Sequence, residues 1–141
     1  MRFVNANKFA ARLMATGEPV FAFSFFALVT MRTALEIPVA QLRSDQPLDA
    51  FLPAAAAWIA LLGSEIYGWD EEFEQGPLVG AKGRGGPLWQ EGKHGFCEER
   101  WNLWRERFGE LAEMENAISE EVKGLARQAE ERMSQIESKV A

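Results

Sequence analysis

The chain has 141 residues, the usual length of one domain, and its 48% apolar and 26% charged residues exclude a disordered chain. One cysteine excludes a disulfide framework, and one histidine excludes a metal site built mainly from histidine and cysteine. The net charge of −6 argues against nucleic acid as the main partner. We therefore expect one domain, residues 1–141, with no metal and no cofactor.

The first helix is predicted over residues 4–16. Apolar side chains recur there at helical spacing, which places Phe9, Leu13 and Met14 on its inner side. Gly17 follows as a C-terminal stop.

A second helix is predicted over residues 19–36, since Pro19 suits a first helical turn. Apolar residues cover every face of this helix between Val20 and Met31. Such a helix is buried all round, either in the core or at a subunit contact.

A third helix is predicted over residues 53–70, with Pro53 in its first turn. One kinked helix running from Pro47 onward is the alternative. The apolar stretches 20–31 and 50–62 are shorter than the roughly 20 residues that span a bilayer. We therefore expect a soluble, cytoplasmic protein without a membrane partner.

Residues 71–95 contain seven of the twelve glycines and form the longest irregular segment. Loops this long are uncommon in compact domains unless they are functional or disordered. The glycines at 83, 85 and 86 fit no phosphate-binding motif. We expect instead that they allow backbone turns through which Leu88 and Trp89 pack back onto the helices.

Two further helices complete the chain. The fourth starts near Phe96, and an apolar seam follows it. The fifth spans about residues 119–139, with Ser119 as its N-cap. The predicted fold is all-α: one compact domain of about five helices, with the 71–95 loop ordered across the third and fourth helices. The fourth seam comprises Cys97, Trp101, Trp104, Phe108 and Leu111, and the fifth comprises Val122, Leu125, Ala129, Met133, Ile136 and Val140.

Glu65 is the carboxylate most suggestive of chemistry, because it shares a helix face with apolar residues. One interpretation is an acid/base group acting with Asp70 and His94. The other is a buried ion pair with Arg100 or Arg105 that sets the register of two helices. Cys97 is expected to be a packed, inert thiol rather than a nucleophile activated by His94.

Five tryptophans lie between positions 58 and 104 and form a wide apolar surface. Their N–H groups need acceptors, for which Glu65 and Asp70 are candidates. Tryptophan walls with a few polar groups are typical of a small-molecule site. The residues predicted to bind such a ligand are Trp58, Glu65, Trp69, Trp89, Arg100, Trp101, Trp104 and Arg105.

Four segments together carry a family resemblance: EIYGWDEEF (65–73), GRGGPLW (83–89), GKHGFCEERWNLWRERF (92–108) and SEEVKGLARQAEERM (119–133). Over about residues 20–136 the chain resembles a family of fungal, mostly helical proteins known as a domain of unknown function. The resemblance implies an intracellular helical fold and supplies no catalytic residues.

The predicted function is a non-catalytic interaction or small-molecule-binding module, with its tryptophan-rich region under the glycine-rich loop. The alternative is a small cofactor-free enzyme that acts on an apolar metabolite through Glu65 or Asp70 with His94. A purely structural role for residues 65–108 stays open as well. A homodimer through residues 19–36 or 53–70 is also expected. The second helix is apolar on every face, and only four other helices are present to cover it.

Overall fold

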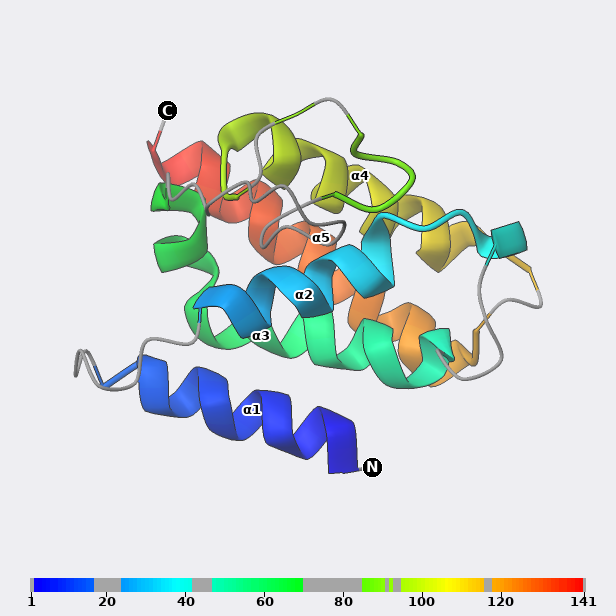
Figure 1. The fold of residues 1–141 in the computed structure, drawn as a ribbon, viewed down its shortest axis with the longest axis horizontal. Coiled ribbons are helices and arrows are strands. Elements are labelled where there is room, and N and C mark those ends of the chain that lie inside the picture. The colour runs from blue at the N-terminus through cyan, green and yellow to red at the C-terminus, as the bar shows by residue number, and fades with distance from the viewer. Residues whose placement is uncertain are drawn as a thin grey trace, which may run out of the picture.

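The computed structural model describes residues 2–16, 24–41, 47–69, 85–90, 92, 95–115 and 118–140 (Figure 1). Within these residues the chain forms five α-helices, one short 3₁₀ helix and no β-strand, which confirms the all-α prediction. The elements are α1 (Arg2–Met14), α2 (Ser24–Leu35), η2 (Val39–Gln41), α3 (Leu48–Gly68), α4 (Glu98–Glu113) and α5 (Glu120–Val140).

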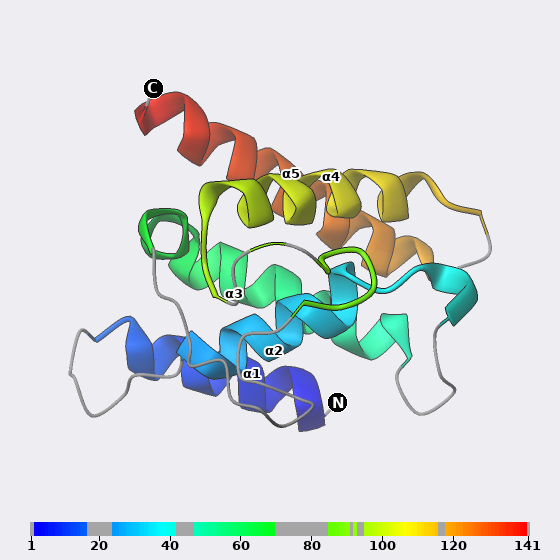
Figure 2. The same cartoon turned by 45° about the horizontal axis from the view of Figure 1, so that its top comes forward.

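Helix α3 is the centre of the bundle, and it packs against α1, α2 and α5. Helix α4 lies on α5 and also contacts α2. Figures 1 and 2 show that α1, α3 and α5 run in one direction, while α2 and α4 run in the other. One shared hydrophobic core, to which all five helices contribute, joins them into a single domain.

Helix α3 is longer than the predicted 53–70 helix, and the alternative that starts at Pro47 is correct. Pro47 is the N-cap, and Pro53 lies inside the helix. A proline at this position removes one intrahelical hydrogen bond. Burial of every residue from Leu52 to Ile59 compensates for that loss. The one non-helical residue is Leu62, with φ −136° and ψ 19°, so the kink lies well beyond the proline.

This 21-residue helix is long and apolar enough to cross a membrane by length and composition. The two shorter stretches considered in the sequence did not reveal this length. In the fold, 61% of its apolar window is buried against the rest of the chain. Packing within the bundle therefore accounts for its apolar composition.

Helix α1 is present, and of its predicted inner face Leu13 and Met14 are partly buried, whereas the prediction for Phe9 is wrong. Phe9 is 64% exposed, and the buried residues are Val4, Asn7 and Ala11. Asn7 can lie inside because its Oδ1 accepts hydrogen bonds from Thr30 Oγ1 (2.8 Å) and Trp58 Nε1 (2.7 Å). The apolar pattern did not predict this face, because the polar residue Asn7 and the small residue Ala11 form much of the buried stripe.

Helix α2 confirms residues 24–35 of the predicted 19–36 helix, and residues 19–23 lie outside the described part of the chain. Seven of its twelve residues are buried. Phe26, near its start, is 57% exposed, so α2 is not covered on every face within the described structure.

Helices α4 and α5 agree with the sequence prediction. Most residues of the two predicted seams are buried, among them Trp101, Trp104 and Met133. Helix α4 begins two residues later than predicted, with Cys97 as its N-cap. Ser119 caps α5 as expected: its Oγ accepts a hydrogen bond from the Val122 N–H at 3.3 Å.

Candidate functional site

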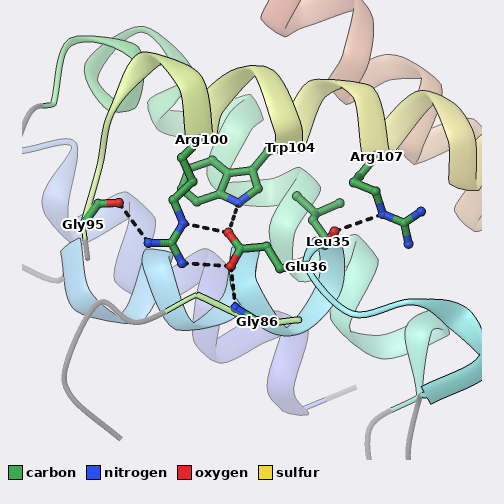
Figure 3. A network of polar contacts seen from close by, with 7 residues as sticks. All are labelled: Leu35, Glu36, Gly86, Gly95, Arg100, Trp104 and Arg107. Atoms are coloured by element: carbon green, nitrogen blue, oxygen red, sulfur yellow. Dashed lines mark hydrogen bonds and ion pairs between the residues drawn. The ribbon is translucent and has the colours of Figure 1, made fainter. Parts of the chain in front are cut away.

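Glu36, directly after α2, carries the most completely buried carboxylate described. Both it and Arg100 on α4 have no exposed surface. Arg100 Nε donates to Glu36 Oε2 at 2.7 Å, and its second terminal nitrogen donates to Oε1 at 2.9 Å (Figure 3). This two-pronged geometry is the strongest arrangement available to an arginine and a carboxylate.

Two more donors complete the shell of the carboxylate. Trp104 Nε1 donates to Glu36 Oε2 at 2.6 Å, and the Gly86 N–H donates to Oε1 at 2.9 Å. Each carboxylate oxygen thus accepts two hydrogen bonds. We call Glu36, Gly86, Arg100 and Trp104 the Glu36 clamp, because it joins the end of α2, the 85–90 segment and α4 (Figure 3).

Two arginines of α4 also bind backbone carbonyl groups in and beside the clamp. Arg100 donates to the Gly95 carbonyl at 3.0 Å, and Arg107 Nε donates to the Leu35 carbonyl at 3.0 Å (Figure 3). The Leu35 carbonyl lies at the end of α2, where intrahelical partners run out. The Leu88 N–H donates to the Glu36 carbonyl at 2.9 Å.

The described part of the glycine-rich segment therefore packs on the end of α2 and, as predicted, on α4. Residues 71–84 of the predicted loop lie outside the described residues, so its contact with α3 stays a prediction. Gly86 is needed for close approach: a Cβ there would lie 2.8 Å from the Glu36 carbonyl oxygen. Trp89 does pack back, with the Arg100 guanidinium 5.7 Å from its ring centroid. Leu88 is 39% exposed, so the prediction that it packs inward is wrong.

Glu65 is exposed on α3, so the alternative of a buried ion pair with Arg100 or Arg105 is wrong. The buried partner of Arg100 is Glu36, and Arg105 pairs with Glu137 at 2.6 Å. A signal for Glu36 exists in the sequence: it is the only acid between Glu18 and Asp45, and it stands at a helix C-terminus, where a carboxylate needs a compensating cation.

The other two catalytic candidates, Asp70 and His94, lie outside the described residues. The structure therefore leaves the enzyme alternative as a prediction. Within the described residues, no group of three or more histidine, cysteine, aspartate or glutamate side chains could hold a metal ion.

The predicted tryptophan site is largely occupied by internal contacts. Trp58, Trp101 and Trp104 are buried. Their N–H groups bond to Asn7, Glu137 and Glu36 respectively, instead of to the predicted acceptors Glu65 and Asp70.

The two remaining tryptophans are only partly buried. The Trp69 ring packs edge-on against the Phe96 ring, with 4.9 Å between the ring centroids. The Arg100 guanidinium lies over the ring of Trp89. A ligand among these indoles stays a prediction.

Cys97 is a free, half-buried thiol at the start of α4. Burial, with a contribution from Glu99, raises the pKa of the Cys97 thiol above its usual value. A raised pKa means less thiolate at neutral pH and therefore a weaker nucleophile. This agrees with the expectation of a packed, inert thiol.

A cavity of about 660 Å³ lies elsewhere, where α1 and α5 flank α3. We call it the α3 groove. None of the residues predicted to bind a ligand lines it. Its apolar surface consists of small and branched side chains, including Val4, Pro53, Ala57, Ala60, Val122 and Leu125.

Charged residues of the α3 groove come from all three helices. Lys8 belongs to α1, Asp49 to α3, and Glu121 and Arg132 to α5. Asp49 is already engaged, because its Oδ1 accepts a hydrogen bond from the Ser119 N–H at 3.0 Å. Sequence reasoning missed the groove, because the spacing within each helix says nothing about how α1 and α5 are placed on α3.

Fold and site together define a small helical protein with one tightly closed polar cluster and an open, largely apolar groove. The chain belongs to the family described as "Protein of unknown function (DUF3632)", whose model matches residues 1–108. This confirms the resemblance to a domain of unknown function. The matched range differs from the expected 20–136, because it includes α1 and ends within α4. Neither a curated protein nor a solved structure matches the chain.

Proposed function

We propose that this protein is a non-catalytic binding protein for a small, largely apolar molecule, and that the ligand lies in the α3 groove. The observation that carries the proposal is the groove itself. Its volume of about 660 Å³ falls within the roughly 300–1,000 Å³ typical of small-molecule sites. This moves the predicted ligand site from the tryptophan-rich region to the face of α3 that α1 and α5 flank.

The chemistry of the groove lining supports binding. Alanine and proline side chains of α3 line the groove together with one apolar side chain of α1, Val4, and three of α5, which are Val122, Leu125 and Ala129. An apolar lining with a few charged groups favours a ligand with a hydrophobic body. Among the described residues, the lining contains neither histidine nor cysteine, which are frequent acid/base and nucleophilic groups.

The test fills the groove without disturbing the core. Ala60 lines the groove and is exposed, so Ala60→Phe adds bulk where the fold has room. We expect Ala60→Phe to weaken binding of an apolar fluorescent probe, Nile red, at least tenfold, because the added ring occupies the ligand volume.

The matched control is Leu61→Phe, at the next position of α3, which is also exposed and does not line the groove. Its probe affinity should stay within about twofold of the unmodified protein. Equal affinity in both variants, or no binding of the probe to the unmodified protein, contradicts the proposal. Thermal unfolding by circular dichroism confirms that both variants are folded.

The predicted homodimer through residues 19–36 or 53–70 stays a separate proposal. Phe26 on α2 and Leu61 on α3 are exposed apolar side chains that support it. Sedimentation velocity of the intact chain measures this directly, and a monomer at all concentrations contradicts it.

A further inference from the structure

The two ends of the α3 groove differ in charge. At the end where α3 and α5 begin, the charged lining residues are Asp49 and Glu121. Lys8 and Arg132 are the positively charged lining residues, and contacts across the bundle place them at the other end.

Lys8 is placed by its neighbour on α1. The Asn7 side chain accepts a hydrogen bond from Trp58 at 2.7 Å, so this turn of α1 lies level with residues 57–60 of α3. Since α1 and α3 run in the same direction (Figure 1), Lys8 lies beside the Ala60 end of the groove.

Arg132 is placed by the packing of α5 on α3. A Cβ on Gly63 would lie 2.7 Å from Ile136 Cδ1, which puts Ile136 level with Gly63. Arg132 precedes Ile136 by one helical turn, so it lies level with about Ala60. Two helices thus bring one cation each to the same end of one groove.

These two cations differ from the arginines around the bundle. Arg100, Arg105, Arg107 and Arg127 each have a carboxylate partner. Within the described residues, the side chains of Lys8 and Arg132 have no ion pair or hydrogen bond, although Arg132 is half-buried. A half-buried guanidinium without a partner favours an incoming anion.

We propose that the ligand of the α3 groove is a monomeric amphiphile with one anionic head group and one apolar chain. This inference rests on the proposed function and specifies its ligand class. The head group contacts Lys8 and Arg132, and the chain lies along Ala57 and Pro53 toward the acidic end. Asp49 and Glu121 oppose the reverse orientation by like-charge repulsion.

The distance between the ends agrees with a chain of medium length. Ala60 and Asp49 are eleven positions apart on α3, or about 16 Å at the helical rise. An extended chain of about that length reaches from the cations to the acids. A fatty-acid carboxylate is the simplest molecule with these properties.

The experiment compares laurate with lauryl alcohol, which has the same chain and no charge. Binding of each to the intact protein is measured by displacement of Nile red. We expect Lys8→Gln/Arg132→Gln to weaken laurate about tenfold or more, because charge-assisted hydrogen bonds are lost. Lauryl alcohol should change less than about twofold. Glu121→Gln is the matched control, since it also lines the groove and removes an acid; laurate should bind it at least as well as the unmodified protein.

The outcomes separate the two proposals. If laurate and the alcohol both bind but the double variant weakens neither, or weakens both equally, the charge inference is overturned and the groove remains a binding site. If neither displaces Nile red from the unmodified protein, the ligand class is overturned, while the groove remains a binding site provided that Ala60→Phe still weakens Nile red binding. If Nile red itself does not bind the unmodified protein, both proposals are overturned. Binding only to vesicles containing phosphatidylserine, with no affinity for free laurate, also overturns the inference, because the occupant is then a membrane surface.

Discussion

The Glu36 clamp and the α3 groove use the same kinds of side chain in opposite ways. In the clamp, a buried carboxylate accepts four hydrogen bonds and Arg100 is fully enclosed. In the groove, Arg132 is half-buried and has no partner within the described residues. A polar group that is fully satisfied inside a protein holds its structure, whereas an unsatisfied one at a cavity is available to a ligand.

The largest effect is expected from truncating Arg100, for which Arg132→Ala is the comparison. Arg100→Ala leaves Glu36 buried without its cation, and such a loss costs about 3–5 kcal/mol. Arg132→Ala removes a side chain without a partner and should change stability by less than about 0.5 kcal/mol. Urea unfolding of both variants measures the difference.

A sharper form of this test removes both charges of the clamp. Because desolvation of an ion pair offsets much of its attraction, Glu36→Leu/Arg100→Met should be more stable than Arg100→Ala alone. Similar unfolding free energies for Arg100→Ala and Arg132→Ala would contradict the view that Arg100 stabilises the fold and Arg132 does not.

The next effect concerns the wall of the groove that α1 provides. Asn7→Ala removes the acceptor of the Thr30 hydroxyl and the Trp58 N–H, both of which are buried. Leaving such groups unpaired costs about 1–3 kcal/mol. We expect lower unfolding free energy and weaker probe binding together, since α1 loses its attachment to α2 and α3.

Asn5→Ala is the control for this prediction, because Asn5 is exposed on the same helix. It should leave both quantities close to those of the unmodified protein. If Asn7→Ala lowers stability and binding no more than Asn5→Ala does, the buried amide does not position α1.

The smallest effect is expected at the glycine of the clamp. Gly86→Ala brings a Cβ within 2.9 Å of the Glu36 Cβ, and the crowding should cost about 1–2 kcal/mol. Gly124→Ala, on α5 with open space around it, should instead stabilise the protein by up to about 1 kcal/mol. Thermal unfolding measures both effects: the unfolding temperature should fall for Gly86→Ala and rise for Gly124→Ala. A shift in the same direction for both variants contradicts the close contact between the 85–90 segment and the end of α2.

Local pattern predicted the helices well where one face was consistently apolar. The seams of α4 and α5 repeat large residues every three or four positions, and most of these residues are buried. In α1 the buried stripe contains Asn7, whose burial depends on partners 23 and 51 residues away. Local pattern therefore selected Phe9, which the structure exposes.

Pro53 shows a similar limit. A proline favours a helix start, which predicts a helix that begins at Pro53. The continuous helix from Leu48 is possible because α1, α2 and α5 bury the residues around Pro53. Tertiary packing thus outweighs a local preference.

The sequence by itself determined the helical class and the inward faces of α4 and α5, since periodic apolar spacing acts within one helix. Only the tertiary structure decided that Arg100 pairs with Glu36 instead of Glu65, and that a groove opens beside α3 where α1 and α5 flank it. Glu36 and Arg100 are 64 positions apart. Contacts over such separations depend on how whole helices pack against one another, which no local pattern records.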